Sequence, residues 1–228
     1  TLIGGEGDDQ LDGGAGKDTY LFDADTTLGS DMLTDTSGIE TISFVGTTAD
    51  VTFSLGSTTP QSINGGLLTV TLASATTFDN LIGGDGNDSL TGNSGANSLT
   101  GGAGNDSLAG GGGDDSYPFD TDLILGTDTI DESGGGLDTL DFTLTTTLAV
   151  TVNLSQPGPQ TVNSNLSLVL GSDTTLENIV GGTQSDNLTG NSLANTLTGN
   201  GGNDVLPGGA GDDVFRFDVD VAQGADTI

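Results

Sequence analysis

The chain has 228 residues, of which 40 are glycine, and 33 acidic side chains face only two basic ones, which gives a formal charge of −31. Two basic residues exclude nucleic acid as a partner, and the absence of cysteine and histidine excludes disulfides, thiolate chemistry and imidazole metal ligands. No apolar run is long enough to span a membrane. Because a compact fold with this charge would repel itself, we expect bound cations.

Nine-residue repeats occupy three blocks of the chain. The blocks start at Gly4, Gly83 and Gly181 and hold two, four and four units, such as GGDGNDSLT at residues 83–91. The sixth position is Asp in eight of the ten units and Asn in two, and the eighth position is always apolar. A disordered linker would not keep an apolar residue in phase through ten units, so the blocks are predicted to fold.

A longer period lies over the short one. Phe22, Phe119 and Phe217 each follow a block and open similar segments, with spacings of 97 and 98 residues. We therefore expect one continuous solenoid over residues 1–228, with modules at about 1–80, 81–178 and 179–228. Both ends fall inside a module, so we expect the chain to be a window from a longer array.

The segments between blocks alternate apolar and polar residues, as in VTFSL at 51–55, LTVTL at 68–72, VTVNL at 150–154 and LSLVL at 166–170. Alternation with β-branched residues predicts strands with one buried face. Turn-forming residues at 56–66 and 155–165 separate these strands. No segment shows a sustained helical period, so the predicted fold is all-β.

The nonapeptide carries the chemistry of a calcium site. Glycines at positions one, two and four allow a backbone turn whose carbonyls face one point, and the acid at position six can point there too. Ca²⁺ takes six to eight oxygen ligands, more than one turn supplies. Two nonapeptides per coil would place each turn over the turn 18 residues later, so that both turns contribute ligands to ions between them.

This stacking pairs Asp88 with Asp106, Asn97 with Asp115, Asp186 with Asp204 and Asn195 with Asp213. The turns with Asn carry one charge less and are predicted to bind more weakly. Each block is followed by a sequence similar to G-x-D-T-[IL], which contains Asp31, Asp128 or Asp226, and further acids occur at Glu40 and Asp138. These acids are predicted either to continue the rows of calcium ligands or to be simple turn residues. The predicted metal ligands are the side chains of Asp9, Asp18, Asp31, Asp88, Asn97, Asp106, Asp115, Asp128, Asp138, Asp186, Asn195, Asp204, Asp213 and Asp226, together with turn carbonyls.

The pattern G-G-x-G-x-D-x-U-x, where U is apolar, resembles the calcium-binding repeat of the RTX family. This resemblance implies a right-handed parallel β-roll, or β-helix solenoid, with several Ca²⁺ ions in two rows between stacked turns. It also implies a bacterial protein exported by type I secretion. Aromatic pairs that close each block, such as Tyr20 with Phe22, Tyr117 with Phe119 and Phe215 with Phe217, are expected to face inward.

Family membership indicates the fold more than the function, because members include toxins, enzymes and adhesins. Adjacent carboxylates such as Asp8 and Asp9 recur with the repeat and diverge on an extended turn, so we expect no catalytic pair and no enzyme activity in this chain. We expect a calcium-dependent structural segment, namely a stalk, spacer, adhesin or matrix filament, that folds outside the cell or at the bacterial surface. The alternatives are an accessory domain of a secreted lipase, protease or polysaccharide epimerase, and a segment that self-assembles through its strand edges.

Overall fold

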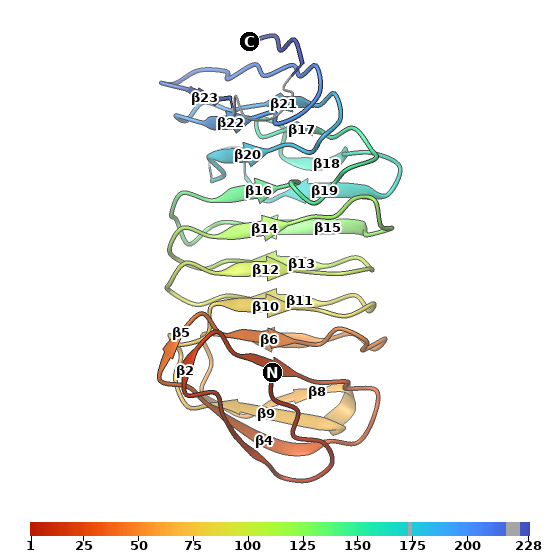
Figure 1. Cartoon of the computed structure of the whole chain (residues 1–228), viewed down its shortest axis with the longest axis vertical. Coiled ribbons are helices and arrows are strands. Elements are labelled where there is room, and N and C mark those ends of the chain that lie inside the picture. Colours follow the sequence, from red (N-terminus) through yellow and green to blue (C-terminus); the bar gives the residue numbers. More distant parts are fainter. Residues whose placement is uncertain (173–174, 218–223) are drawn as a thin grey trace.

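The computed structural model describes residues 1–172, 175–217 and 224–228 and shows a vertical stack of flat coils that runs from the N-terminus to the C-terminus (Figure 1). Short strands alternate with turns along every coil. In the first half of the chain the elements are β1 (Gln10–Asp12), β2 (Ala15–Gly16), β3 (Thr19–Leu21), β4 (Gly29–Thr34), β5 (Ser37–Gly38), β6 (Thr41–Ser43), β7 (Thr52–Ser54), β8 (Gln61–Ile63), η1 (Asn64–Gly66), β9 (Leu68–Leu72), β10 (Asn80–Ile82), β11 (Ser89–Thr91), β12 (Ser98–Thr100) and β13 (Ser107–Ala109). In the second half they are β14 (Ser116–Pro118), β15 (Gly126–Asp131), β16 (Thr139–Asp141), β17 (Thr151–Asn153), β18 (Gly158–Thr161), β19 (Leu166–Leu170), β20 (Asn178–Val180), β21 (Asn187–Thr189), β22 (Thr196–Thr198) and β23 (Val214–Arg216).

Parallel sheets form the two faces of the stack. One face is a single nine-stranded sheet in the order β23-β22-β20-β16-β14-β12-β10-β6-β3. The opposite face is divided into a four-stranded sheet (β1-β4-β9-β8), a six-stranded sheet (β18-β19-β15-β13-β11-β7) and the pair β17-β21. These parallel sheets and the near absence of helix confirm the predicted all-β roll.

Strand register gives the length of each coil. Asn80 pairs with Ser98, Ser98 with Ser116, Ser116 with Thr139, and Thr139 with Asn178, so successive coils take 18, 18, 23 and 39 residues. The 18-residue coils contain two nonapeptides each, which confirms the predicted stacking. These four lengths also account for the long period of 97 to 98 residues, because one narrow pair and one wide pair of coils make one repeat.

The apolar stripe of the nonapeptides fills the interior. Leu90, Leu99, Leu108 and Tyr117 have no exposed surface, because successive eighth-position side chains stack inside the roll. The rings of Tyr20, Phe22, Tyr117 and Phe119 are also buried, as expected. The expectation is wrong for the third aromatic pair, since Phe215 is only partly buried and Phe217 is 45% exposed. No described coil covers these two rings as a following coil covers Tyr117 and Phe119.

The two segments predicted as turns contain extra strands. Residues 56–66 include β8 and η1, and residues 155–165 include β18. Each of these strands runs antiparallel to the next strand, β8 to β9 and β18 to β19. Equivalent glutamines fix both hairpins: Gln61 bonds the backbone of Ser54, and Gln160 bonds the backbone of Asn153 in the same way. Polar turn residues hid these strands from the sequence pattern.

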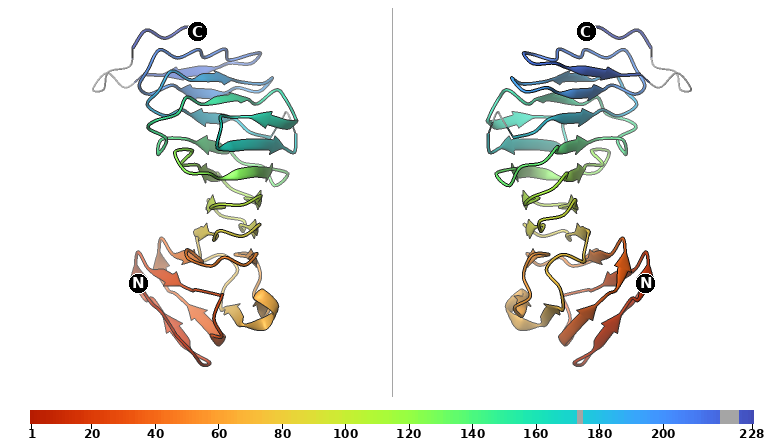
Figure 2. Two further views of the ribbon diagram at one scale, coloured as in Figure 1. Left: turned by 90° about the vertical axis from the view of Figure 1, so that its right-hand side faces the viewer. Right: turned by 90° about the vertical axis from the view of Figure 1, so that its left-hand side faces the viewer.

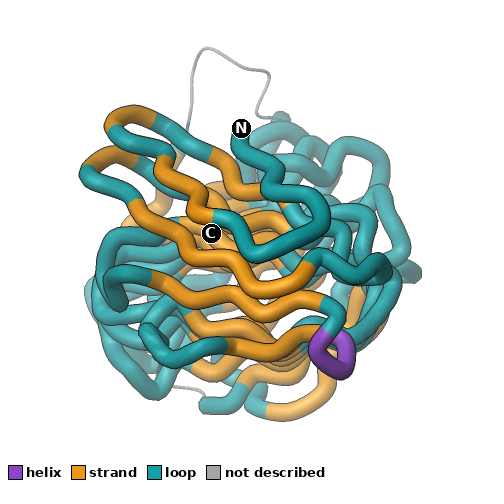
Figure 3. The backbone as a smooth tube through the Cα atoms, turned by 90° about the horizontal axis from the view of Figure 1, so that it is seen from below, coloured by secondary structure: helices purple, strands orange, loops and turns teal. Residues whose placement is uncertain are grey.

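The roll changes width along its length. Figure 2 shows that the yellow and light-green coils are the narrowest, and that the coils on either side, in orange and in teal, are wider. Seen along the stack, the strands lie over one another and η1 lies at one corner (Figure 3). Within the described residues η1 is the only helical element, and no helix has the length and apolar character of a membrane span.

Candidate metal centre

The sixth-position acids join each coil to the one before it. Asp106 accepts a hydrogen bond on Oδ1 from the backbone N–H of Asp88 at 2.8 Å, and Asp115 accepts one from Asn97 at 2.7 Å. Asp204 and Asp213 do the same for Asp186 and Asn195 at 2.8 and 3.0 Å. All four predicted partners, 18 residues apart, are therefore adjacent in space.

The acids beyond the nonapeptides continue these two rows. Asp31, Asp128 and Asp226 accept the N–H groups of Asp9, Asp106 and Asp204, and Asp138 accepts that of Asp115. Their bonds have the same geometry as those inside the blocks, although the chain takes 22 or 23 residues to return. The rows of acids thus run without a break from the narrow coils onto the wide ones.

The ten nonapeptide turns have two conformations. In four of them, which we call closed turns, the second residue donates its N–H to the side chain of the sixth residue. Gly84 donates to Asp88 Oδ2 at 2.7 Å, and Gly182 donates to Asp186 Oδ2 at 2.8 Å. The turns of Asn97 and Asn195 are closed in the same way, by the N–H groups of Asn93 and Asn191. Oδ1 of Asp88 and of Asp186 accepts the N–H of Val51 and of Val150, respectively. Both oxygens of these two aspartates therefore have partners within the protein.

The other six turns, which we call open turns, have a positive φ at the second and fourth positions. Examples are Gly102 and Gly104, with φ of 106° and 128°, and Gly111 and Gly113, with φ of 100° and 102°. Only glycine adopts this backbone readily, although Asn200 takes the second position of one open turn with φ of 63°. The sixth residues of the open turns are Asp9, Asp18, Asp106, Asp115, Asp204 and Asp213.

Four of the six open turns leave a buried carboxylate oxygen without a partner. Oδ2 of Asp9, Asp106, Asp115 and Asp204 is buried and has no hydrogen bond within the protein. The same holds for Oδ2 of Asp31 and Asp138 in the continuing rows. Both basic side chains, Lys17 and Arg216, are exposed. Buried, unpaired carboxylate oxygens beside turn carbonyls are the donor set of a hard divalent cation, so these residues fit Ca²⁺.

The turns with Asn differ from the predicted weaker ion sites. Asn97 donates from its amide nitrogen to the carbonyls of Asp79 at 3.0 Å and Phe78 at 3.3 Å, and Asn93 donates to Phe78 at 2.7 Å. Asn195 donates to the carbonyl of Glu177 at 3.0 Å. The amide N–H groups thus satisfy carbonyls that would otherwise face the turn, and the predicted ligand role of Asn97 and Asn195 competes with these bonds.

Burial raises the pKa of several carboxyl groups in the rows. Desolvation is the largest cause, followed by nearby acids, and it raises the pKa of Asp106 and Asp128 to about 7 and that of Asp115 and Asp186 to about 6. Glu132 shows the largest effect, because burial and the charges of Asp138 and Asp115 raise its pKa to about 9. Such groups resist ionisation unless a cation is near them.

The sequence pattern did not identify Glu132 as a site residue. One oxygen each from Asp115, Glu132 and Asp138 lies within 4.8 Å of the others, and all three residues are buried. Comparison of the two long repeats could have found it, since Asp35 occupies the corresponding place 97 residues earlier. Comparison of the two long repeats could likewise have found Glu177 and Asp79, which the sequence pattern did not identify. Each accepts the N–H of the acid on the coil before it, Asp138 and Glu40 respectively.

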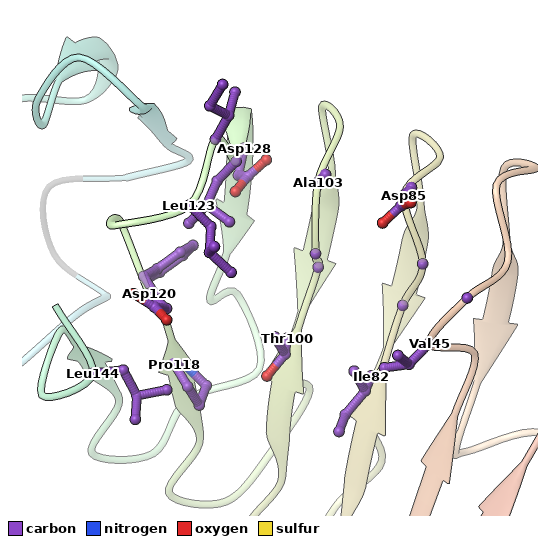
Figure 4. A pocket seen from close by; sticks show the side chains of 18 residues that line it. Val45, Ile82, Asp85, Thr100, Ala103, Pro118, Asp120, Leu123, Asp128 and Leu144 are labelled. Carbon is purple, nitrogen blue, oxygen red and sulfur yellow. The ribbon is translucent and has the colours of Figure 1, made fainter.

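A hollow of about 250 Å³ lies on the outer face of the nine-stranded sheet (Figure 4). Its lining is mostly apolar and includes Val45 and Ile82 on neighbouring coils, and Leu123, Ile124 and Leu144 on the loops above them. Leu123 and Ile124 are 60% and 77% exposed. Its lining also includes Asp85, Asp120 and Asp128, and Asp128 belongs to one of the acidic rows.

The comparisons with known proteins agree with this geometry. The family described as "RTX calcium-binding nonapeptide repeat (4 copies)" matches residues 1–28, 79–117 and 180–215. These segments cover all ten nonapeptide turns, open and closed. The search of curated proteins found no match. The chain thus carries RTX calcium-binding nonapeptide repeats, which identify it as a calcium-binding repeat domain.

Proposed function

We propose that the chain is a non-catalytic structural segment, such as a stalk or spacer, of a secreted or cell-surface bacterial protein, and that it folds when it meets Ca²⁺ outside the cell. One observation carries this proposal: the open turns place buried carboxylate oxygens in rows without a partner in the protein. With 33 acidic and two basic side chains, the chain cannot neutralise them at neutral pH with its own cationic groups. Folding and calcium binding are therefore one process.

The direction of the switch follows from linkage. Without a cation, the acids of successive coils repel one another and cost desolvation free energy, so the extended chain is favoured. An ion that binds only the folded chain adds stability that grows with its concentration. In a cytoplasm poor in calcium the chain stays extended and can be exported, and it folds where calcium is plentiful.

The coil architecture supports a structural role. Each long repeat adds two narrow and two wide coils to the same stack, and the described strands of each coil pair with the coils before and after it. Added repeats lengthen such a rod without adding a new kind of site. A stalk or spacer needs this property.

The test is a calcium titration of the chain followed by far-UV circular dichroism. We expect a coil-to-β transition with Ca²⁺ that a chelator reverses. Mg²⁺ is the control and should not replace Ca²⁺, because it demands a small octahedral site and keeps its waters. A β spectrum that is indifferent to chelator would overturn the proposal, since the apolar stripe alone would then hold the roll.

A further inference from the structure

Glu132 lies where the narrow coils meet the wide ones. It follows directly after β15, on the coil next to the open turn of Asp115, while Asp138 precedes β16 on the same coil. Asp115, Glu132 and Asp138 are 1%, 2% and 0% exposed. Both oxygens of Glu132 and Oδ2 of the two aspartates have no hydrogen-bond partner in the protein. An unpaired, fully buried glutamate thus lies beside two carboxylates that each keep one oxygen without a partner.

The backbone leaves room for these oxygens at Gly110. A Cβ atom on Gly110 would overlap Asp115 Oδ2 and would lie 2.5 Å from Glu132 Oε1. The N–H of Gly110 donates to the Tyr117 hydroxyl at 2.7 Å, so that ring ends beside the same space. The absence of a side chain at residue 110 is therefore what lets both carboxylates converge.

The first long repeat has the same acids with their lengths exchanged. Residues 35, 40 and 79 are Asp, Glu and Asp, and the corresponding residues 132, 138 and 177 are Glu, Asp and Glu. In each copy the three acids therefore alternate in length, Asp being the short acid and Glu the long one. Glu40 stacks on Asp79, and Asp138 stacks on Glu177. Acids that served only as solvated turn residues would have no reason to keep their combined length, whereas ligands that meet at one ion must keep their combined reach.

We propose that Asp115, Glu132 and Asp138 form a calcium site in which Glu132, from a wide coil, completes the ligand set of an open nonapeptide turn. This inference rests on the proposed calcium-dependent folding and extends it from the nonapeptides to the wide coils. Asp18, Asp35 and Glu40 are the corresponding residues of the first repeat, where the Tyr20 hydroxyl donates to Asp35 at 2.8 Å.

The two tyrosines make the two sites separately visible. The chain has two Tyr and no Trp, and each Tyr ends beside one of the acid groups, so bound Tb³⁺ can be excited through the neighbouring ring. In a Tyr20→Phe background Tyr117 is the remaining tyrosine, and its Tb³⁺ luminescence reports the site of Glu132. Calcium displaces the Tb³⁺, which gives the affinity of this site for calcium.

Glu132→Gln in that background should weaken Tb³⁺ and Ca²⁺ at the Tyr117 site by at least about tenfold, the lower end of the loss seen when a metal site loses even a supporting group. The matched control is Asp131→Asn, which removes the same charge from the neighbouring, exposed residue and should leave the signal unchanged. Unchanged luminescence and affinity in Glu132→Gln would overturn the inference. Failure of the parent chain to gain β structure with Ca²⁺ would instead overturn the proposed function.

A second pair of variants keeps the test decisive if Glu132→Gln does not fold. Glu132→Asp leaves two short acids and should weaken the site. Adding Asp138→Glu and Glu177→Asp recreates the arrangement of the first repeat and should restore the affinity. If this triple variant binds no better than Glu132→Asp, the exchange of lengths carries no meaning and the inference is wrong.

Discussion

Closed and open turns differ although their sequences are nearly the same. The closed turn GGDGND at 83–88 and the open turn GGAGND at 101–106 share every glycine and the final acid. In the closed turn Asp88 takes two backbone N–H groups, whereas in the open turn Asp106 takes one and keeps a buried oxygen free. The comparison shows that the motif alone does not set the demand for a cation.

The coil beneath each turn explains the difference. The closed turn at 83–88 lies on a wide coil, where the N–H of Asp85 bonds the carbonyl of Thr47 at 2.8 Å. The open turn at 101–106 lies on the closed turn, and Gly102 and Gly104 lie directly over the carbonyls of Gly84 and Gly86. A nonapeptide turn that lies directly over a wide coil is thus closed by bonds within the protein. The turn stacked on it, 18 residues later in the chain, is open.

The largest expected effect should come from pH in the presence of a chelator, because pH acts on the buried acids of the rows in open and closed turns alike. The raised pKa values of Asp106, Asp128 and Asp115, about 7, 7 and 6, mean that the folded chain without metal binds more protons than the unfolded chain between about pH 4 and 7. Their contribution to stability is present in full below about pH 4 and is lost as the pH rises through the folded pKa values.

We therefore expect acid to restore β structure to the chain in chelator, and Ca²⁺ to restore it at neutral pH. Far-UV circular dichroism between pH 8 and pH 4, with and without chelator, measures both. A chain in chelator whose β signal does not rise on acidification would show that the unpaired carboxylates are not what prevents folding.

Gly110→Ala should have the next largest effect, because the added methyl group would occupy the space of the Asp115 and Glu132 oxygens. Overpacking of this kind costs about 1–3 kcal/mol, and loss of the ion would add to it. Gly112→Ala is the matched control in the same turn, since its nearest neighbour would be 3.9 Å away. Calcium-dependent thermal unfolding compares the two, and equal melting temperatures would contradict the placement of the site.

The smallest effect is also the sharpest, because it changes sign between the turns. Asp88→Asn removes one acceptor from a carboxylate that takes two N–H bonds, so it should lower the stability by about 1–3 kcal/mol with or without Ca²⁺. Asp106→Asn removes a carboxyl group that must take up a proton when the chain folds without metal, so it should stabilise the chain in chelator at mildly acid pH, where residual β structure can be measured, and weaken it in Ca²⁺. Two variants that respond alike would mean that open and closed turns do not differ in their need for a cation.

Much of the fold could be predicted from the sequence because the repeats are strict. The apolar eighth position predicted the buried stripe of Leu90, Leu99 and Leu108, and the 18-residue stacking followed from two nonapeptides per coil. The alternation of apolar residues could not predict the antiparallel strands β8 and β18, because Gln61 and Gln160 hold them through side-chain bonds to the backbone seven residues earlier. Their local sequence is typical of turns.

The sequence by itself determined the phase of the apolar stripe, the rows of acids and the excess of negative charge that calls for cations. The nine-residue spacing sets these features, because the same kind of residue recurs at the same position of each repeat. Only the tertiary structure decided which turns open and that Glu132 meets Asp115 and Asp138. The physical reason is that both depend on the neighbouring coil, whose carbonyls and N–H groups either satisfy a carboxylate or leave it for an ion.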